Sequence, residues 1–370
     1  MQCPHIPEME QQAFSDKLRA GPRAPYGGMI EITSRCNNRC AHCYVPPRDA
    51  AAEQDALSTQ FLLRLLDVLF EEQCIWLTFT GGEPLIRDDF PAVYEAAKRR
   101  GFVVAVFTNA TLLTDEIADL FYELPPRLVS ISLYGSTPEV YERVSRVPGS
   151  FEAAMAGINR VKERGLNAHL KTMALQSNHE DLPNLRAFAE QLGWHFHFDT
   201  GVNPRLDRAT GVFRERLDPE TAVALDTDTD ERRPQWRESF ERYPRVESRR
   251  IYDCNAGRIS FAVDSRGGLL TCIVNRLPRW QLDERDFAGS FKRAFYEQMP
   301  HVLVEEAQGD FPCGRCPIRT LCPTCLAWRA LEAGDPTLPV EWGCRVAVAR
   351  AKAIGLADIS CPGLDGNELT

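Results

Sequence analysis

The chain has 370 residues, of which 44% are hydrophobic and 26% are charged, a composition that suits one large globular domain with a smaller one beside it. Its net charge of −9 argues against broad binding to nucleic acid, and the sequence contains no run of about eighteen apolar residues that would span a membrane. The first 28 residues lack the basic-then-apolar layout of a signal peptide.

Predicted strands and helices alternate from residue 29 to about residue 200. The expected strands are 29–33, 75–79, 102–107, 128–133, 166–175 and 195–199, and the expected helices are 58–70, 90–100, 114–121, 138–143, 150–164 and 182–192. Ser58 is a candidate N-cap and Gly101 a candidate C-cap. Strand–helix repeats with short connections predict parallel strands joined by right-handed crossovers. Six repeats, rather than the eight of a closed barrel, predict an α/β fold with a partial (β/α)6 TIM-like barrel. A doubly wound open sheet is the alternative.

The pattern changes beyond residue 200. Residues 201–250 are rich in Pro, Asp, Glu and Arg, with one helical run at 219–225, and we interpret them as a bridging segment at the barrel mouth. Apolar anchors favour this interpretation over a disordered linker: Phe213, Trp236, Phe240 and Tyr243. Residues 251–370 form a predicted second domain that begins with a hairpin of 258–263 and 269–273. Residues 1–28 would then be an N-terminal extension and 29–200 the barrel.

Thirteen cysteines without a secretory signal indicate metal or redox ligands in a reducing cytoplasm rather than disulfides. Three lie in the loop after the first strand and seven between Cys254 and Cys344, whereas Cys3, Cys74 and Cys361 stand apart. None lies between Cys74 and Cys254. The distribution therefore predicts two separate metal-bearing regions.

The loop after the first strand carries Cys36, Cys40 and Cys43 within eight residues. Three thiolates this close together can hold three corners of a small iron–sulfur cube. Because such clusters normally take four cysteines, one iron would remain open to an exogenous ligand. A zinc loop and three ordinary cysteines are the alternatives.

Polar residues also follow the next strands, at the carboxyl ends where parallel barrels gather their chemistry. Gly81-Gly82-Glu83-Pro84 follows the second strand, Asn109 follows the third, and Ser132 closes the fourth. The two glycines allow a close backbone approach, and the Glu83 carboxylate can accept a hydrogen bond from a cationic amine. We interpret the segment as a ligand-binding turn, although Asn109 would also suit a loop cap.

Together, Cys36-x3-Cys40-x2-Cys43 and Gly81-Gly82-Glu83-Pro84 resemble the radical S-adenosylmethionine (SAM) superfamily over roughly residues 27–200. The resemblance implies a [4Fe–4S] cluster whose open iron is chelated by the amino and carboxylate groups of SAM. One electron, supplied by a flavodoxin or ferredoxin, would split SAM into methionine and a 5′-deoxyadenosyl radical. That radical would take a hydrogen atom from the substrate.

The same resemblance implies roles for individual residues near SAM. The methionine amino group would be lined by Gly81, Gly82 and Glu83, and the adenine would meet the backbone at His42. The alternative for His42 is a simple loop residue. Ser132 would reach the ribose or carboxylate side, Asn109 would belong to the same site, and Arg143 or Arg146 would pair with the methionine carboxylate. Relatives read Ser-Leu-Asp-Gly on strand four, whereas this chain reads Ser132-Leu133-Tyr134-Gly135.

The second region resembles the SPASM extension of radical enzymes that modify peptides and proteins, although two residues rather than three precede its sixth cysteine. The resemblance implies two auxiliary [4Fe–4S] clusters. One would take Cys254, Cys272 and Cys325 with an open or unassigned fourth position, and the other would take Cys313, Cys316, Cys322 and Cys344. Cys361 is a candidate fourth ligand or hydrogen donor, but we expect no role for it. The two Cys-x2-Cys pairs would alternatively suit a zinc ribbon.

Auxiliary clusters carry electrons or accept them from a substrate radical, which favours a maturase that modifies or cross-links a ribosomally made peptide. The alternatives are an enzyme of tetrapyrrole, haem or other cofactor biosynthesis, and a non-enzymatic iron–sulfur electron-transfer or scaffold protein. Only 28 residues precede the first strand, so we expect a peptide to be recognised by a separate leader-binding protein or by the bridging segment. We expect no nucleic acid or membrane partner.

Overall fold

The computed structural model describes residues 21–46, 57–228, 232–242, 247–252, 254, 256–356 and 359–364. Its first half is built on strands β1 (Gly27–Thr33), β2 (Trp76–Gly81), β3 (Val103–Thr108), β4 (Leu128–Ser132), β5 (Ala168–Met173) and β6 (His195–Asp199). These strands pair in parallel and in chain order. The predicted α/β fold with six parallel strands is therefore confirmed.

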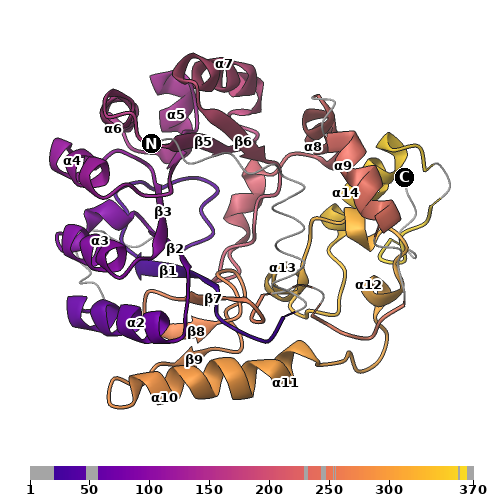
Figure 1. Cartoon of the computed structure of the whole chain (residues 1–370). Coiled ribbons are helices and arrows are strands. Elements are labelled where there is room, and N and C mark those ends of the chain that lie inside the picture. The colour runs from indigo at the N-terminus through magenta and orange to yellow at the C-terminus, as the bar shows by residue number, and fades with distance from the viewer. Residues whose placement is uncertain are drawn as a thin grey trace.

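The helices between these strands lie outside the sheet (Figure 1). They are α2 (Thr59–Glu71), α3 (Phe90–Arg99), α4 (Asp115–Glu123), α5 (Pro138–Ser145), α6 (Ser150–Glu163) and α7 (Leu182–Leu192), with short 3₁₀ turns at η1 (Pro84–Ile86) and η2 (His179–Asp181). The predicted N-cap of α2 is present, because the Ser58 hydroxyl accepts a hydrogen bond from the backbone N–H of Phe61 at 3.0 Å. Gly101, just beyond α3, has a φ of +87°, which favours glycine there.

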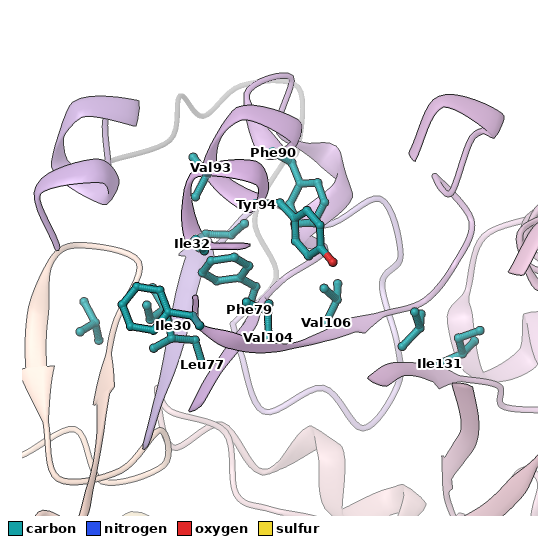
Figure 2. Close-up of a cluster of buried hydrophobic side chains, with 14 of the residues drawn as sticks. Ile30, Ile32, Leu77, Phe79, Phe90, Val93, Tyr94, Val104, Val106 and Ile131 are labelled. Atoms are coloured by element: carbon teal, nitrogen blue, oxygen red, sulfur yellow. The ribbon is translucent and has the colours of Figure 1, made fainter. Parts of the chain in front are cut away.

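Alternation along the strands divides the sheet into a helix-facing and an inner side. On the helix-facing side, Ile30, Phe79, Val106 and their neighbours pack against α3, with exposed fractions of 1% or less (Figure 2). Phe79 meets Phe90 edge to face at a centroid distance of 6.5 Å. Each such side chain contributes about 1.5–3 kcal/mol through its burial. The intervening strand residues point to the inner side, where they line the bowl of the partial barrel.

The hairpin of the second region continues the same sheet. Its strands β7 (Ser260–Val263) and β8 (Gly268–Leu270) pair antiparallel, as predicted, and a short β9 (Trp280–Gln281) follows. However, β7 also pairs in parallel with β1, which gives the strand order β6-β5-β4-β3-β2-β1-β7-β8-β9. The sheet thus crosses the domain boundary predicted at residue 250, and the four-part division of the chain stays a prediction.

The bridging segment contains η3 (Thr210–Glu215), α8 (Pro219–Thr227) and α9 (Arg232–Arg242). Phe213 packs against the loops that follow β4 and β5, and Trp236 and Phe240 pack against buried cysteines of the second region. The predicted helix at 219–225 is present as α8, whereas α9 was not predicted because its sequence lacks an apolar stripe. Tyr243, Cys3 and the first 20 residues lie outside the described residues.

The C-terminal part is a set of short helices beside the hairpin (Figure 1). They are α10 (Phe287–Lys292), the π-helical η4 (Arg293–Gln298), α11 (Met299–Leu303), α12 (Pro312–Arg315), η5 (Arg319–Leu321), α13 (Leu326–Glu332) and α14 (Glu341–Ala353). Helix α14 lies against α8, where Arg350 and Asp226 form an ion pair at 2.9 Å. Within the described part of the chain, no helix is both long enough and apolar enough to span a bilayer.

Candidate functional site

The three cysteines of the first loop lie together at the carboxyl end of β1. Burial raises the pKa of Cys36 to about 12, and the nearby Glu83 carboxylate raises it further. Burial also raises the pKa of Cys40, and the charges of Cys43 and Cys36 add to this effect, so the three sulfurs lie close to one another. A metal reverses this preference, because a coordinated thiol loses its proton. Among the described residues, no three His, Cys, Asp or Glu side chains are placed to hold a single metal ion.

Hydrogen bonds to sulfur fix the position of Cys36. Its sulfur accepts one from the backbone N–H of Asn38 at 3.4 Å and one from the Asn109 side-chain amide at 4.0 Å. The same amide of Asn109 donates to the side-chain oxygen of Asn37 at 3.1 Å. Asn109, predicted at the cofactor site, is thus a direct neighbour of the first thiol. Because hydrogen bonds to sulfur help set the potential of iron–sulfur clusters, this contact has a chemical consequence.

The rest of the loop is held by the end of α5. The backbone N–H groups of Arg39 and Ala41 donate to the carbonyls of Ser145 and Val144, each at 2.9 Å. These carbonyls belong to the last turn of the helix, where intrahelical partners are missing. The loop and the helix therefore satisfy each other's backbone groups, and the thiols are held from two sides.

The Gly-Gly-Glu turn is clamped to the cysteine loop by its backbone. The N–H of Gly82 donates to the carbonyl of Thr33 at 3.0 Å, and the N–H of Glu83 donates to the carbonyl of Arg35 at 2.8 Å. A Cβ atom at Gly81 would lie 2.1 Å from the Thr33 oxygen, and one at Gly82 would lie 2.1 Å from the Arg35 oxygen. Only glycine permits this approach, so the pair of glycines joins the two motifs.

The Glu83 carboxylate is hydrogen-bonded to groups of the chain itself. It is fully buried and accepts hydrogen bonds from the Thr108 hydroxyl at 2.7 Å, the Asn109 N–H at 2.7 Å and the Leu85 N–H at 3.1 Å. Burial raises its pKa to about 7, and these hydrogen bonds oppose that rise. Glu83 thus ties the end of β2 to the end of β3. The expectation that its carboxylate meets an amine stays a prediction.

Tyr134, which follows β4, lies against the cysteine loop. Its ring meets His42 edge to face at 4.9 Å and Tyr141 at 5.9 Å, and its hydroxyl is hydrogen-bonded to Ser132. Burial lowers the pKa of His42 to about 4, so its imidazole is neutral. The Nδ1 atom of His42 is buried without a hydrogen-bond partner among the described residues. Such an atom calls for a polar ligand.

Lys171 on β5 is a cation at the site that sequence reasoning missed. It lies opposite Ser132 in the strand register, and its Nζ stands 3.4 Å from the centroid of the Phe107 ring. Burial lowers its pKa to about 7, while the Glu83 carboxylate opposes that change. Arg143, by contrast, is exposed on α5, and its guanidinium donates to the Ser177 carbonyl at 3.3 Å.

Arg146 is likewise exposed, at the C-cap of α5. The sequence signal for Lys171 was its position in the strand. Side chains alternate between the two faces, so His169 and Lys171 lie on the inner side and Leu170 lies on the helix-facing side. The predicted pairing of an α5 arginine with the SAM carboxylate stays untested.

Three histidines continue the inner wall beyond Lys171. His169 lies on β5, and one of its ring nitrogens is 2.7 Å from the Ser130 hydroxyl. Its ring centroid lies 6.3 Å from that of His195 on β6. Burial lowers the pKa of His169 to about 4, and Lys171 and two histidines add to this effect. Burial likewise lowers the pKa of His197, the third histidine. The wall is therefore lined by polar rings, of which His169 is neutral at pH 7.

An ion pair joins this bowl to the second region. Arg276, which follows the hairpin, donates to both carboxylate oxygens of Glu31 on β1, at 2.6 and 2.9 Å. Only 6% of the Glu31 side chain is exposed. Tyr44 lies beside this pair, and burial raises the pKa of its hydroxyl, which the charges of both Cys43 and Cys272 raise further. The first cysteine loop and the first cysteines of the second region are therefore neighbours.

Two cysteines of the first predicted auxiliary set lie close together. Burial raises the pKa of Cys272, and the charge of Cys325 raises it further. The Cys272 sulfur accepts a hydrogen bond from the N–H of Asn275 at 3.3 Å. Cys325 and Cys254 are both exposed.

The four cysteines of the second predicted set line a single small cavity. The lining includes Cys313, Cys316, Cys322 and Cys344, together with Arg319, Arg329 and a fifth cysteine, Cys361. Cys361 was considered for the first set, with no role as the expectation. The structure places it in the second set instead, because the chain returns to this cavity after α14.

Taken together, the described part of the chain is a half-barrel whose first strand ends in a three-thiol loop clamped to a Gly-Gly-Glu turn. This arrangement is the one expected for a site that binds an iron–sulfur cluster and SAM. Residues 30–189 match the model of the Radical SAM superfamily, so the barrel part of the chain belongs to this superfamily. The thiols, the hydrogen-bond donors to sulfur and the unpartnered His42 nitrogen fit a [4Fe–4S] cluster and SAM.

Relatives by sequence fall into more than one functional group. The chain is 31% identical over 160 residues to the Fe-coproporphyrin III synthase of Methanosarcina barkeri (strain Fusaro / DSM 804), covering 43% of this chain and 40% of the relative. It is 27% identical over 169 residues to the PqqA peptide cyclase of Granulibacter bethesdensis (strain ATCC BAA-1260 / CGDNIH1), covering 46% of this chain and 45% of the relative. The matched part is thus less than half the length of either protein.

Solved structures resemble the chain over nearly its whole length. Streptococcus suis SuiB bound to the precursor peptide SuiA aligns with a TM-score of 0.65 at 14% identity, covering 91% of this chain and 81% of that one. The enzyme anSMEcpe with bound AdoMet and the Cp18Cys peptide aligns with a TM-score of 0.62 at 17% identity, covering 89% of this chain and 96% of that one. At these identities the likeness concerns the fold, and it confirms the predicted barrel followed by a cysteine-rich hairpin region.

Proposed function

We propose that this radical SAM enzyme modifies or cross-links a ribosomally made peptide. The observation that carries the proposal is the presence of two sets of cysteines beyond the barrel. One set contains Cys272 and Cys325, and the other lines the five-thiol cavity. Auxiliary [4Fe–4S] clusters held there would accept the electron that remains after a new bond forms on a substrate radical. Further support comes from two proteins of the same fold, both solved with peptides.

The bound cluster and SAM supply the electron and the carbon radical that takes a hydrogen atom from the substrate. The chain's own task is to position them. Peptide groups of Gly81, Gly82 and Glu83 would meet the methionine amino group. Lys171 would pair with the methionine carboxylate, because its buried amine gains a counter-ion there and Arg143 is already exposed and hydrogen-bonded elsewhere. Asn109 would donate to the Cys36 sulfur.

The site must also exclude water, because a carbon radical reacts with any loose hydrogen donor. His42, Tyr134 and Tyr141 form a packed aromatic group next to the cysteine loop. Tyr141 belongs to α5, the helix whose last turn anchors the loop. These rings would keep the sulfonium side of SAM dry while the bowl remains open toward the histidine wall.

A second candidate function is the modification of a tetrapyrrole. It is favoured by sequence relatives that are named as haem and coproporphyrin synthases. Lys171 and the histidines of β5 and β6 would then meet acidic groups of the substrate. A non-enzymatic electron-transfer role is the remaining alternative, and the clamped Gly-Gly-Glu turn argues against it because electron transfer alone needs no SAM site.

Anaerobic reconstitution with iron and sulfide, followed by SAM and dithionite, tests these alternatives. We expect release of 5′-deoxyadenosine that rises with the true peptide, transfer of deuterium from a labelled peptide, and a product lacking two hydrogen atoms. Stimulation by iron coproporphyrin III rather than by peptides would support the second candidate. No 5′-deoxyadenosine with either substrate would contradict an enzymatic role. The matched control is the Cys40→Ser variant.

Peptide capture would involve the bridging segment or a separate leader-binding protein. Val212 and Phe213 pack on the loops after β4 and β5, so this segment stands beside the bowl. A pull-down with candidate leader-binding proteins should retain the peptide only when both proteins are present. Tight binding of the peptide by this chain alone would instead assign recognition to the bridging segment. A search of the adjacent genes for a short precursor would supply candidate peptides.

A further inference from the structure

The second cysteine group contains one thiol more than a cluster needs. Iron–sulfur clusters take four cysteine thiolates, whereas five thiols line the cavity between α12, α14 and the C-terminal segment. The fifth, Cys361, is not part of the cysteine array that resembles the SPASM extension. It is 5% exposed, like Cys316 and Cys344, so all three sulfurs are internal.

Cys361 is held at this position by its own segment. The N–H of Leu364 donates to the Cys361 carbonyl at 2.8 Å, which closes a turn. A Cβ atom at Gly363 would lie 2.6 Å from the Cys344 sulfur, so the backbone at that position passes directly beside a predicted ligand. Leu364 and Ile359 pack on the same hydrophobic cluster as the thiols. The segment is thus built against the cavity.

The sulfur of Cys361 lies 3.8 Å from that of Cys316. It also interacts with the Cys344 thiol, whereas Cys322 is engaged elsewhere, with Thr324 at 3.1 Å and the Gly343 carbonyl at 3.6 Å. Because the Cys316 and Cys361 sulfurs are in van der Waals contact, they occupy the same corner of the cavity. An iron placed at that corner is within reach of either.

The charge of the cavity fits an anionic occupant. Arg329 is 1% exposed and lines the cavity, and its Nη2 has no hydrogen-bond partner among the described residues. Its Nε donates to the Pro336 carbonyl at 2.6 Å, which aims the guanidinium. A buried cation is costly without an anion nearby. Thiolates around a cluster supply that anion.

We propose that Cys361 is a fifth ligand of the second auxiliary cluster and takes the same iron as Cys316, so that either thiolate completes the site. In the exchange, one iron–sulfur bond forms as the other breaks. The proton of the incoming thiol passes to the departing thiolate, and the net charge of the site does not change. The inference rests on the auxiliary clusters of the proposed function.

The test uses the full chain with Cys36, Cys40 and Cys43 replaced by alanine, so that only auxiliary iron is counted. Iron, sulfide and the electron paramagnetic resonance spectrum of the reduced cluster are measured after anaerobic reconstitution. We expect Cys316→Ser and Cys361→Ser each to retain the iron of this cluster. The double variant leaves three thiols at this cavity, so it should lose at least about one iron per chain and change the spectrum of the cluster. Retention of the iron by the double variant would overturn the proposal.

The matched control is Cys322→Ser, since the described contacts of the Cys322 sulfur are with Thr324 and the Gly343 carbonyl rather than with Cys361. It should lose as much iron as the double variant. If Cys316→Ser alone loses iron to the same extent as Cys322→Ser, Cys361 is a bystander and the inference is wrong. If the background chain itself binds no auxiliary iron, the proposed clusters fail along with it. Thermal unfolding of the iron-free variants separates loss of ligand from loss of fold, because a folded variant that lacks iron has lost a ligand.

Discussion

The two cysteine regions of this molecule are built in opposite ways. In the barrel, three thiols come from one loop, and backbone hydrogen bonds from Gly82, Glu83, Arg39 and Ala41 fix the segments around them. In the C-terminal region, five thiols come from separate segments and meet around one cavity. The first site has one thiol too few for a cluster and the second has one too many. A missing ligand leaves room for a reactant, whereas a surplus protects a cluster whose task is electron transfer.

The largest effects should separate the two regions completely. Cys40→Ser removes one of only three ligands, so 5′-deoxyadenosine formation should fall to background while auxiliary iron stays. Cys322→Ser should do the reverse, removing auxiliary iron while SAM cleavage without substrate continues. Chromatography of the nucleoside product and iron analysis measure both. Loss of both signals in either variant would mean that the two sites are not independent.

The ion pair between the regions should have the next largest effect. Removal of one partner of a buried pair costs about 3–5 kcal/mol. We therefore expect Arg276→Met to lower the free energy of unfolding by about that amount, because it leaves Glu31 buried without its partner. Urea unfolding measures the change. The double variant Glu31→Gln with Arg276→Met should recover part of the loss, and a double variant as unstable as the sum of the singles would show that the pair is not coupled.

Lys171 should affect SAM binding more than Arg143 does. Hydrogen bonds to charged groups contribute about 1.5–3 kcal/mol, so Lys171→Met should weaken SAM binding by roughly 10- to 100-fold. Arg143→Met is the matched control and should change binding little, because that side chain is exposed. Calorimetric titration of the reconstituted protein measures both. If both variants lost the same SAM affinity, Lys171 would not be the main partner of the SAM carboxylate, and an arginine of α5 would remain the candidate.

The same lysine gives a pH dependence of stability. Its pKa is lowered from 10.5 to about 7 in the folded chain, so the unfolded chain binds more protons between these values. The free energy of unfolding of the iron-free protein should therefore rise with pH from about 7 to about 10 relative to that of Lys171→Met. If the free energy of unfolding changed with pH in the same way in both proteins, the lowered pKa of Lys171 would be contradicted.

The smallest effect should come from the aromatic group beside the cysteine loop. Tyr134→Phe removes only a hydroxyl, which is hydrogen-bonded to Ser132 and to the Cys40 thiol, at a cost of about 1 kcal/mol. The ring contacts with His42 remain, so the first cluster should persist in air about as long as in the unchanged protein. Tyr134→Ala removes the ring and should shorten that lifetime. Ultraviolet–visible bleaching of the cluster measures both variants.

Local patterns in the sequence predicted the barrel well. Each strand and helix from β1 to β6 depends on nearby residues, such as the apolar alternation of β2 and the Ser58 cap. The cysteine loop and the Gly-Gly-Glu turn were also readable, since each is a short segment. The pairing of β7 with β1 was not, because it joins residues more than 200 positions apart and no local pattern encodes it.

The position of a side chain in the site was predictable only where its contacts are with residues nearby in the sequence. Cys361 follows Cys344 by 17 residues, and the turn at Gly363, not the spacing, brings it into the cavity. The role of Glu83 toward a ligand stays a prediction, whereas the hydrogen bonds from the Leu85 and Asn109 N–H groups to its carboxylate could not be read from the sequence. Lys171 was missed because a lysine inside a barrel contradicts the usual exposure of this residue.

The parallel pairing of β7 with β1 means that the strand which leads into the first cysteine loop is an interior strand of the sheet. A chain ending after residue 200 would present the N–H and carbonyl groups of β1 as an open edge, a template for pairing with other chains. Excised barrels should therefore self-associate. For the same reason, any shift in the hairpin is transmitted by one backbone ladder to the strand that leads into the first cysteine loop.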